Sequence, residues 1–403
     1  MKDYTYLFSK LAKKAKPSVV RELLKLIDKP QIISFAGGLP SADEFPKDDI
    51  AQILKDIVLE HSHTALQYGT TEGSKVFRQE ICSWLKEQED IDITMDNLVV
   101  TSASQQALDM IGRLFISPGD DIVVTNPTYL GALQVFHACE AAMHGADTDE
   151  QGLIPASLES TLKKLKDAGK QCKFIYLVPD FQNPTGVTIP QERRVEILDI
   201  AKKYKTIIIE DSPYRQIRFE GDAPQTFLKL DNNEGNVVTL FTFSKILSPG
   251  FRLGYVAGPA QIIRNLVVLK QTMDLCSPSL LQQAAAKYMS MGLLAPHIKH
   301  VTDVYKVKRS TMLEALKKHM PKGISWTKPQ GGLFLWITLP DYMDSEQIFE
   351  NAIEENVAYV PGSVFYCEGD VKNNIRINFS YATLPDIEEG VKRLAKAIEK
   401  NIQ

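Results

Sequence analysis

A lysine and an aspartate each stand at the end of a short β-branched run. Lys245 follows VVTLFTFS, and Asp211 ends TIIIED. A lysine directly after an apolar strand can lose its hydration and become nucleophilic, although most lysines are solvated. Asp211, which precedes Ser-Pro, is either a functional carboxylate or an ordinary turn opener. Glu210 points to the other side of the strand end and is interpreted as structural.

Three further polar clusters follow predicted strands. Ser102, Ser104 and Gln105 lie between NLVVT and a helical stretch, where free backbone N–H groups favour an anion and where an ordinary serine cap is equally common. Asn183 lies in QNPTG, whose proline and glycine predict a sharp turn. Arg376 lies in NNIRINFS between two isoleucines, so on the pattern alone it could simply alternate outward on a strand.

The elements that must position these residues alternate along the chain. β-branched runs separated by amphipathic segments indicate βαβ units around a mostly parallel sheet. In such sheets the ligand crevice lies outside the carboxyl ends of the strands, so the polar clusters should converge there. The predicted strands are Asn97–Thr101, Asp121–Thr125, Lys173–Val178, Thr206–Glu210, Val237–Phe243 and Tyr255–Ala257, and the predicted helices include Gln105–Phe115, Pro190–Tyr204 and His297–His319.

The pattern of predicted helices and strands changes past about residue 290, which predicts two domains. Residues 46–292 form the large sheet domain, and residues 293–403 mix helices with short strands in a smaller α+β domain. Residues 1–45 are too short for a domain. We expect them to form an arm with a helix at Ser18–Ile27, packing on the small domain or on a partner subunit.

Composition excludes several classes of protein. The chain has 403 residues, of which 44% are hydrophobic, and a formal net charge of −4, so it lacks the basic excess of a duplex-binding protein. No apolar run approaches the roughly 20 residues of a membrane helix, and no signal peptide is evident. The five scattered cysteines predict free thiols in a reducing cytoplasm. The histidine groupings lack partners for a metal site.

Seven motifs in order carry a family resemblance. QYGTTEG, TSASQQ, NPTY, PDFQNPTG, EDSPYR, FSKILSPGFRLGY and IRINFS together closely resemble the class I/II aminotransferases, which are pyridoxal-phosphate enzymes of fold type I. The resemblance runs from about Ile33 to Phe379. It implies a large, mostly parallel sheet of the seven-stranded type, flanked by helices, and a smaller α+β domain.

The resemblance assigns roles around the cofactor ring. Lys245 matches the lysine that forms the Schiff base with the cofactor aldehyde, and Asp211 matches the carboxylate that pairs with the pyridinium nitrogen. That pairing keeps the ring an electron sink. Tyr214 and Asn183 match hydrogen-bond donors to the phenolic oxygen, and Tyr129 resembles the aromatic that stacks on the ring.

The resemblance also implies a phosphate cradle and a substrate site. Ser244 and Arg252 join the cluster at residues 102–105 as phosphate contacts, since the planar fork of arginine can pair two phosphate oxygens. Tyr68 matches a tyrosine that reaches the phosphate of the neighbouring subunit, which implies a homodimer with shared active sites. Arg376 matches the arginine that binds the substrate α-carboxylate. Asn183 also faces the substrate, and the segment with Gly37 and Gly38 covers it.

Within the family, SFAGGLP, TSASQQALD and the SKILSPGFRLGY spacing look most like the 2-aminoadipate, kynurenine and aromatic aminotransferase branch. Arg21 falls where that branch has an arginine facing the distal end of the substrate; it either pairs a side-chain carboxylate or extends along an amphipathic helix. One departure from the branch is Phe241, which stands in place of a small residue and could reshape the cavity wall.

The implied reaction moves an amino group from an L-amino acid to a 2-oxo acid, with 2-oxoglutarate as the expected acceptor. Lys245 would act as both base and acid. A lyase or decarboxylase on the same fold would keep the same lysine and aspartate. A regulatory protein would add a helix-turn-helix of roughly 60 residues before the domain, and the motif that begins at Gly37 leaves no room for one.

Overall fold

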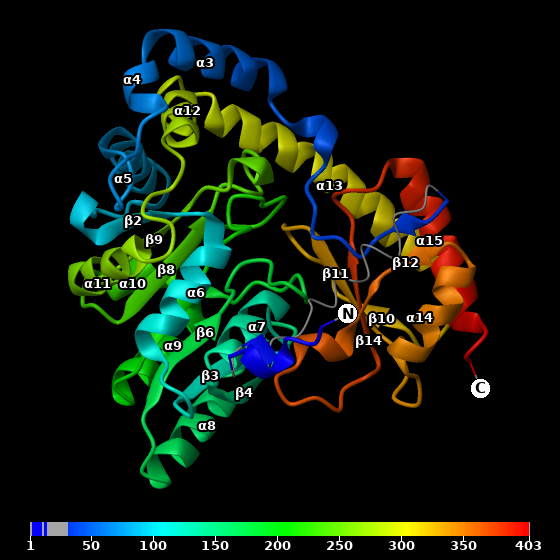
Figure 1. Cartoon of the computed structure of the whole chain (residues 1–403). Helices are drawn as coiled ribbons and strands as arrows, with labels where there is room; N and C mark the ends of the chain where they lie inside the picture. The colour runs from blue at the N-terminus through cyan, green and yellow to red at the C-terminus, as the bar shows by residue number, and fades with distance from the viewer. Residues whose placement is uncertain (1, 10–11, 14–30, 403) are drawn as a thin grey trace.

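An eight-stranded sheet forms the larger part of the computed structural model, which describes residues 2–9, 12–13 and 31–402 (Figure 1). The strand order is β2-β9-β8-β7-β6-β3-β4-β5. The strands from β8 to β4 run parallel, while β2, β9 and β5 pair antiparallel with their neighbours. The bounds are β2 Leu98–Thr101, β3 Asp121–Asn126, β4 Ala142–Asp149, β5 Gly152–Leu153, β6 Cys172–Leu177, β7 Ile207–Asp211, β8 Val237–Thr242 and β9 Gly254–Ala257.

All six predicted strands are confirmed, and two strands were not predicted. β2 and β8 are buried along their whole length, as β-branched runs covered on both faces should be. β4 is half-exposed and reads AMHGADTD, so it carries no apolar run that a sequence pattern could detect. β5 extends the sheet by only two residues beyond β4, which brings the sheet of the described chain from seven strands to eight.

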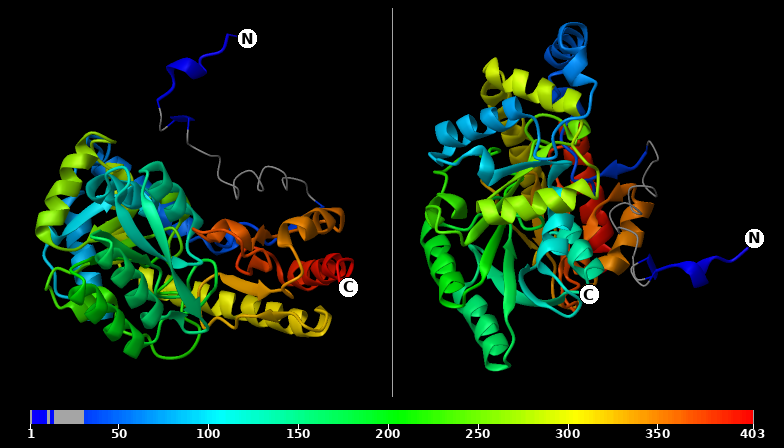
Figure 2. Two further views of the ribbon diagram at one scale, coloured as in Figure 1. Left: turned by 90° about the horizontal axis from the view of Figure 1, so that it is seen from below. Right: turned by 60° about the vertical axis from the view of Figure 1, so that its left-hand side comes forward.

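Helices cover both faces of the sheet (Figure 2). Helices α6 and α7 pack together on one face, and α8, α9 and α10 pack on the other. Two of these helices, α6 and α9, confirm the predicted helices in those places. The bounds are α3 Lys47–Glu60, α4 Ser62–Ala65, α5 Lys75–Glu89, α6 Ala103–Phe115, α7 Leu130–Ala138, α8 Pro155–Asp167, α9 Gln191–Lys203, α10 Phe227–Asp231, α11 Ala260–Gln271 and α12 Ser279–Ser290. None of the described helices is long and apolar enough to cross a membrane.

A smaller antiparallel sheet with flanking helices forms the second part. Its order is β10-β11-β14-β13, and the long helix α13 packs along α15 beside it. A separate parallel pair, β1 with β12, ties the segment before Gly37 to this part. The bounds are α13 Leu294–His319, α14 Ser345–Glu354, α15 Leu384–Glu399, β1 Ile33–Ser34, β10 Ser325–Trp326, β11 Phe334–Thr338, β12 Val357–Ala358, β13 Val360–Pro361 and β14 Asn374–Asn378. The domain limits at residues 45 and 292 stay a prediction, and the predicted helix Ser18–Ile27 lies outside the described residues.

The end of β7 separates two adjacent carboxylates. Glu210 turns away from the crevice and accepts hydrogen bonds from the backbone N–H groups of Phe227 (2.9 Å) and Leu228 (3.2 Å) and from the hydroxyl of Thr239 (2.8 Å). It therefore caps the start of α10, as a carboxylate does at a helix N-terminus, and its structural interpretation is confirmed. Asp211, one residue on, faces the opposite side and is free to serve the crevice.

Candidate active site

The predicted polar clusters converge on one cavity of about 470 Å³ at the carboxyl ends of the parallel strands. Residues from the sheet and from the smaller part both line it. The predicted residues in its wall are Gly38, Ser104, Gln105, Tyr129, Asn183, Asp211, Tyr214, Ser244, Lys245, Arg252 and Arg376. A larger groove of about 610 Å³ behind the QNPTG turn contains none of the predicted site residues.

Lys245 lies just past the end of β8 with its amine in the cavity. The Nζ atom donates a hydrogen bond of 2.7 Å to the carbonyl oxygen of Gly38. Enclosure of the amine lowers the pKa of Lys245 to about 8, and the positive charges of Arg376 and Arg252 add to this effect. The uncharged amine, which is the form that attacks an electrophile, is therefore far more populated near neutral pH than in a lysine of ordinary pKa.

Asp211 is buried at the end of β7. Its Oδ2 atom accepts a hydrogen bond of 2.8 Å from the hydroxyl of Tyr176 on β6, whereas its Oδ1 atom has no partner among the described residues. Burial raises the pKa of Asp211 to about 7, and the Tyr176 hydrogen bond opposes this rise. Tyr176 was missed by the sequence analysis because a tyrosine inside the run FIYLV looks like core packing.

Arg376 is buried, with 3% of its surface exposed, so the outward-facing alternative is wrong. Its guanidinium donates to the side-chain oxygen of Asn183 (2.9 Å) and to the carbonyl of Ala36 (2.6 Å), while its Nε atom has no partner in the described chain. The group lies 4.5 Å from the ring centre of Phe334 and 5.0 Å from that of Phe365. Burial lowers the pKa of Arg376 to about 10. The two phenylalanines come from GGLFLW and GSVF, which gave no signal of a site.

Tyr214 and Asn183 meet beside Arg376. Both side chains line the cavity, and Asn183 accepts a hydrogen bond from Arg376. Burial raises the pKa of Tyr214, and the positive charge of Arg376 opposes the rise. The Tyr214 ring packs edge-on against Phe334 at 5.7 Å. The two loops that follow β6 and β7 thus present a phenol and an amide side by side in the cavity wall.

The start of α6 forms a corner of the cavity. Ala103 adopts a left-handed backbone conformation, with φ of 60°. Ala103 packs closely against Gly254. A Cβ atom on residue 254 would lie 3.0 Å from the Cα of Ala103 and 2.4 Å from the carbonyl oxygen of Phe241. Glycine in RLGY therefore lets the start of α6, with Ser104 and its backbone N–H groups, approach the sheet.

Some predicted residues do not line the cavity of this chain. Ser102 lies outside the wall, and its backbone N–H donates to Gln106 Oε1 at 2.7 Å. Phe241 stacks on Tyr255 with ring centres 4.9 Å apart and does not line the cavity, contrary to the expectation that it could reshape the wall. Tyr68 is 79% exposed. Gly37 is buried next to the wall, and Arg21 lies outside the described residues.

The residues present fit pyridoxal phosphate. The unpartnered Asp211 Oδ1 is an acceptor for a pyridinium N–H. The positive charge of that group would lower the pKa of Asp211, which burial raises, and would keep the carboxylate ionised. Lys245 supplies an amine that can be uncharged. Arg252, Ser244 and the start of α6 offer donors for an anion at one end of the same cavity.

The chain belongs to the class I and II aminotransferases, whose family pattern matches residues 30–394. It is 45% identical to aromatic-amino-acid aminotransferase 1 of Thermococcus litoralis, over 100% of this chain and 96% of that relative. A structure of Pyrococcus horikoshii kynurenine aminotransferase in complex with PMP superposes with a TM-score of 0.96 at 46% identity, covering 100% of this chain and 99% of that one.

A structure of Thermus thermophilus α-aminoadipate aminotransferase complexed with N-(5′-phosphopyridoxyl)-L-leucine is also similar. Its TM-score is 0.91 at 33% identity, and 99% of each chain is covered. These findings confirm the branch that the motifs resemble. The protein is therefore a pyridoxal-phosphate-dependent aminotransferase of fold type I, and the lyase and regulatory alternatives are set aside.

The lowered pKa of Lys245 gives a prediction for the apoprotein. Only the uncharged amine reacts with an acylating reagent, so the rate at Lys245 should rise about tenfold per pH unit below pH 8 and level off above it. Peptide mapping after timed labelling measures this rate, and exposed lysines, whose rates should still be rising at pH 9, are the internal control. A Lys245 profile that levels off only near pH 10 would contradict the prediction.

Proposed function

We propose that the enzyme transfers the amino group of an L-amino acid to a 2-oxo acid, with 2-oxoglutarate as acceptor and Lys245 as the covalent attachment point of the cofactor. The observation that carries the proposal is one cavity holding an amine with a pKa of about 8, a buried carboxylate and a buried arginine. The bound cofactor supplies an electron sink for the bond broken at the substrate Cα.

Lys245 moves the proton in this proposal. With the cofactor bound, Lys245 Nζ would take the proton that leaves the substrate Cα and would return it later in the reaction. A single amine can act as base and then as acid because Lys245 lines the cavity in which the substrate would bind. The pKa of about 8 supports this role, since proton transfer is most efficient when the pKa lies near the working pH.

Asp211 and three neighbours orient the cofactor ring. Asp211 Oδ1 would accept from the ring nitrogen, while Tyr176 donates to the other carboxylate oxygen. Tyr214 and Asn183 would donate to the phenolic oxygen, which would lower the cost of negative charge there. Tyr129 would stack on the ring. Its own ring lies over Gly131, where a Cβ would come within 2.5 Å of it, so that glycine supports the stacking position.

The phosphate and the substrate bind at opposite ends of the cavity. Ser104, Gln105, Ser244 and Arg252 hold the phosphate, while the backbone around Ser102 stays part of the turn that leads into α6. The hydroxyl of Thr242 donates to Ser244 at 2.8 Å and orients it. At the other end Arg376 binds the substrate α-carboxylate, and its unpartnered Nε supports this role. Gly38 covers the substrate.

The donor range follows from the relatives. Proteins named for aromatic amino acids, kynurenine and α-aminoadipate match this chain along almost all of its length. We therefore propose a broad range that includes 2-aminoadipate and aromatic donors. We also propose a cytoplasmic location, which the five free cysteines support.

The direct test of the proposal is covalent trapping. The protein with bound cofactor should be yellow, and borohydride should fix the cofactor to Lys245 alone, as mass spectrometry of peptides would report. Lys245→Ala should lose the label and the formation of glutamate from a panel of donors with 2-oxoglutarate. A label on another lysine, or a Lys245→Ala variant with full activity, would exclude the mechanism.

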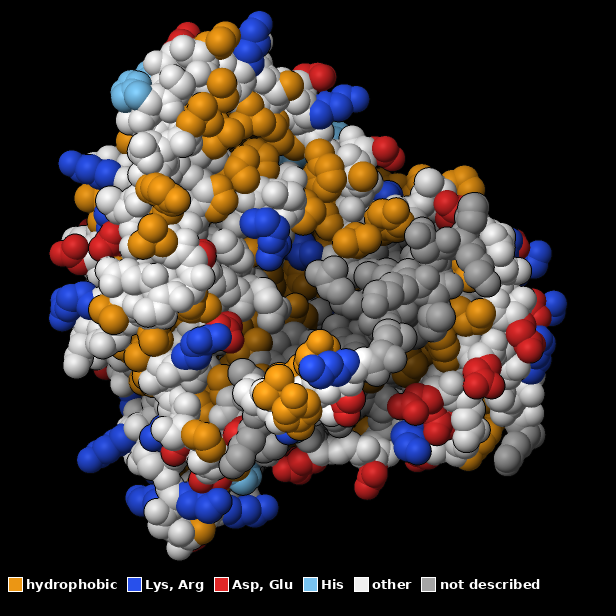
Figure 3. Space-filling model, in the orientation of Figure 1, with side chains coloured by type: hydrophobic (Ala, Val, Ile, Leu, Met, Phe, Trp, Pro, Cys, Tyr) orange, Lys and Arg blue, Asp and Glu red, His pale blue; other side chains and the backbone are white. Residues whose placement is uncertain are grey.

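We propose further that the enzyme is a homodimer with shared active sites. Tyr68 lies outside the cavity of its own chain and is 79% exposed, as a residue serving the partner's phosphate site must be. Leu66 nearby is also exposed, and apolar side chains gather over the part of the surface formed by α3, α4 and α12 (Figure 3). Such a patch favours association.

Tyr68→Phe tests the shared site. Loss of one hydrogen bond to a charged group should weaken cofactor retention by about 1.5–3 kcal/mol without dissociating the dimer. Equilibrium dialysis against pyridoxal phosphate measures retention, and sedimentation measures assembly. Tyr6→Phe, at another exposed tyrosine outside the proposed site, is the matched control. A fully active monomer would refute the proposal.

Two arginines predict a split in substrate range. Arg376→Ala should damage all donors alike, because every amino acid has an α-carboxylate. Arg21→Ala should selectively damage acidic donors such as 2-aminoadipate and glutamate, by up to roughly 3 kcal/mol in kcat/KM, because an unpaired carboxylate keeps its desolvation cost. Aromatic donors should be nearly unaffected. Equal losses across donors in Arg21→Ala would assign Arg21 a structural role and remove the basis for the acidic donors.

A further inference from the structure

Two loops carry the pair Asn183 and Tyr214. The first, residues 179–189, follows β6, and the second, residues 212–226, follows β7. Both side chains line the same cavity wall, yet each loop leaves a different strand. Something outside the cavity has to fix the separation of the loops.

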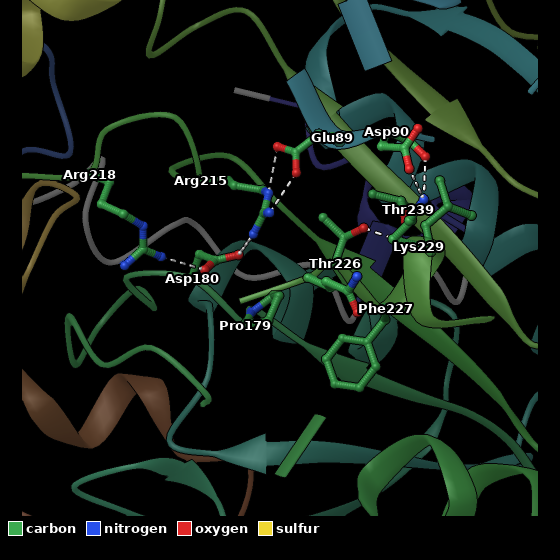
Figure 4. A network of polar contacts seen from close by, with 12 residues as sticks. Glu89, Asp90, Pro179, Asp180, Arg215, Arg218, Thr226, Phe227, Lys229 and Thr239 are labelled. Carbon is green, nitrogen blue, oxygen red and sulfur yellow. Dashed lines mark hydrogen bonds and ion pairs between the residues drawn. The ribbon is translucent and has the colours of Figure 1, made fainter. Parts of the chain in front are cut away.

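Asp180, in the first loop, is fully buried and is bound by three arginines, of which Figure 4 labels Arg215 and Arg218. Its Oδ1 atom lies 2.7 Å from Arg194 and 3.1 Å from Arg218, and its Oδ2 atom lies 3.1 Å from Arg215. Burial alone would raise the pKa of Asp180, but the guanidinium groups outweigh it and hold the pKa below its usual value. The carboxylate is therefore charged and joins both loops.

Arg194, on α9, closes the first loop. Its guanidinium donates to the carbonyl of Pro179 at the start of the loop (3.2 Å) and to the carbonyl of Ile189 at its end (2.8 Å). The same group donates to the carbonyl of Gln225, in the second loop, at 3.0 Å. One fully buried side chain thus holds both ends of the loop that carries Asn183.

Arg215 fixes the second loop from the residue next to Tyr214. Its guanidinium forms a two-pronged pair with Glu89 at the end of α5, with distances of 2.7 Å and 2.6 Å, and its third nitrogen reaches Asp180. Figure 4 shows Arg215 between Glu89 and Asp180. The planar fork sets the position of the Arg215 backbone, and through it the position of Tyr214.

We propose that Asp180 and Arg215 are positioning residues that hold Tyr214 against Asn183, and that they thereby set the protonation of the cofactor bound at Lys245. Buried ion pairs add little net stability over apolar packing, so a cluster of this size behind the site needs another reason. Holding the side chains of Tyr214 and Asn183 at a fixed separation is that reason. The inference rests on the proposed roles of Tyr214 and Asn183.

The test is the pH midpoint of the absorbance change of the bound cofactor. Arg215→Lys keeps the positive charge but cannot contact Glu89 and Asp180 at once. Poorer donation to the phenolic oxygen should raise the midpoint by roughly half a pH unit or more, in the same direction as Tyr214→Phe. Arg193→Lys is the matched control, since Arg193 on the same helix as Arg194 forms a two-pronged pair with Asp149 away from the cavity.

A double variant separates positioning from other effects. If Arg215 acts through Tyr214, Arg215→Lys should add no shift in a Tyr214→Phe background. A midpoint unchanged in Arg215→Lys while Tyr214→Phe shifts it would overturn the inference and leave the proposed function standing. No shift in Tyr214→Phe itself would overturn the proposed role of Tyr214 and the inference with it. Should Arg215→Lys fail to fold, Asp180→Asn is read by the same midpoint and the same rules.

Discussion

The removal of water from one small cavity governs the chemistry of Lys245, Asp211 and Arg376. Each group is shifted toward its neutral form, to pKa values of about 8, 7 and 10. Burial is the leading cause in all three cases, and the mutual repulsion of the cations contributes at Lys245. A ligand that carries the opposite charge would therefore pair with Lys245, Asp211 or Arg376 and stabilise its charged form. A ligand without that charge would leave the buried group unpaired, so the cavity selects for charged ligands.

The sheet and the smaller part divide the work of building this cavity. Asn183, Asp211 and Lys245 follow or end strands β6, β7 and β8, and their side chains line the same cavity. The smaller part supplies Arg376 and Phe334 from β14 and β11, which pair antiparallel with each other. Behind the cavity, Gly254 packs closely against the start of α6, and Asp180 forms buried ion pairs with arginines.

The sequence was informative where chemistry and strand ends coincide. Lys245 and Asp211 stand at the ends of apolar runs, and the QNPTG turn follows another run after three residues, so the strand pattern predicts that they meet. The sequence pattern did not reveal residues whose role depends on contacts with residues far away in the chain. Tyr176 is far from Asp211 in sequence and looks like core, and the half-exposed β4 has no apolar run. Ser102 directly precedes α6, as predicted, but its side chain is not in the cavity wall.

The segment from β1 to Ser41 runs between the two parts, and successive backbone carbonyls accept hydrogen bonds from opposite sides. Phe35 pairs with the smaller part through Ala358 and Asn378, whereas the carbonyls of Ala36 and Gly38 reach Arg376 and Lys245. Positions two apart thus face the cavity, as in any extended chain. Deleting or inserting a single residue here would turn both carbonyls away from their cations. The number of residues in this segment is therefore under tighter constraint than the identity of most of its side chains.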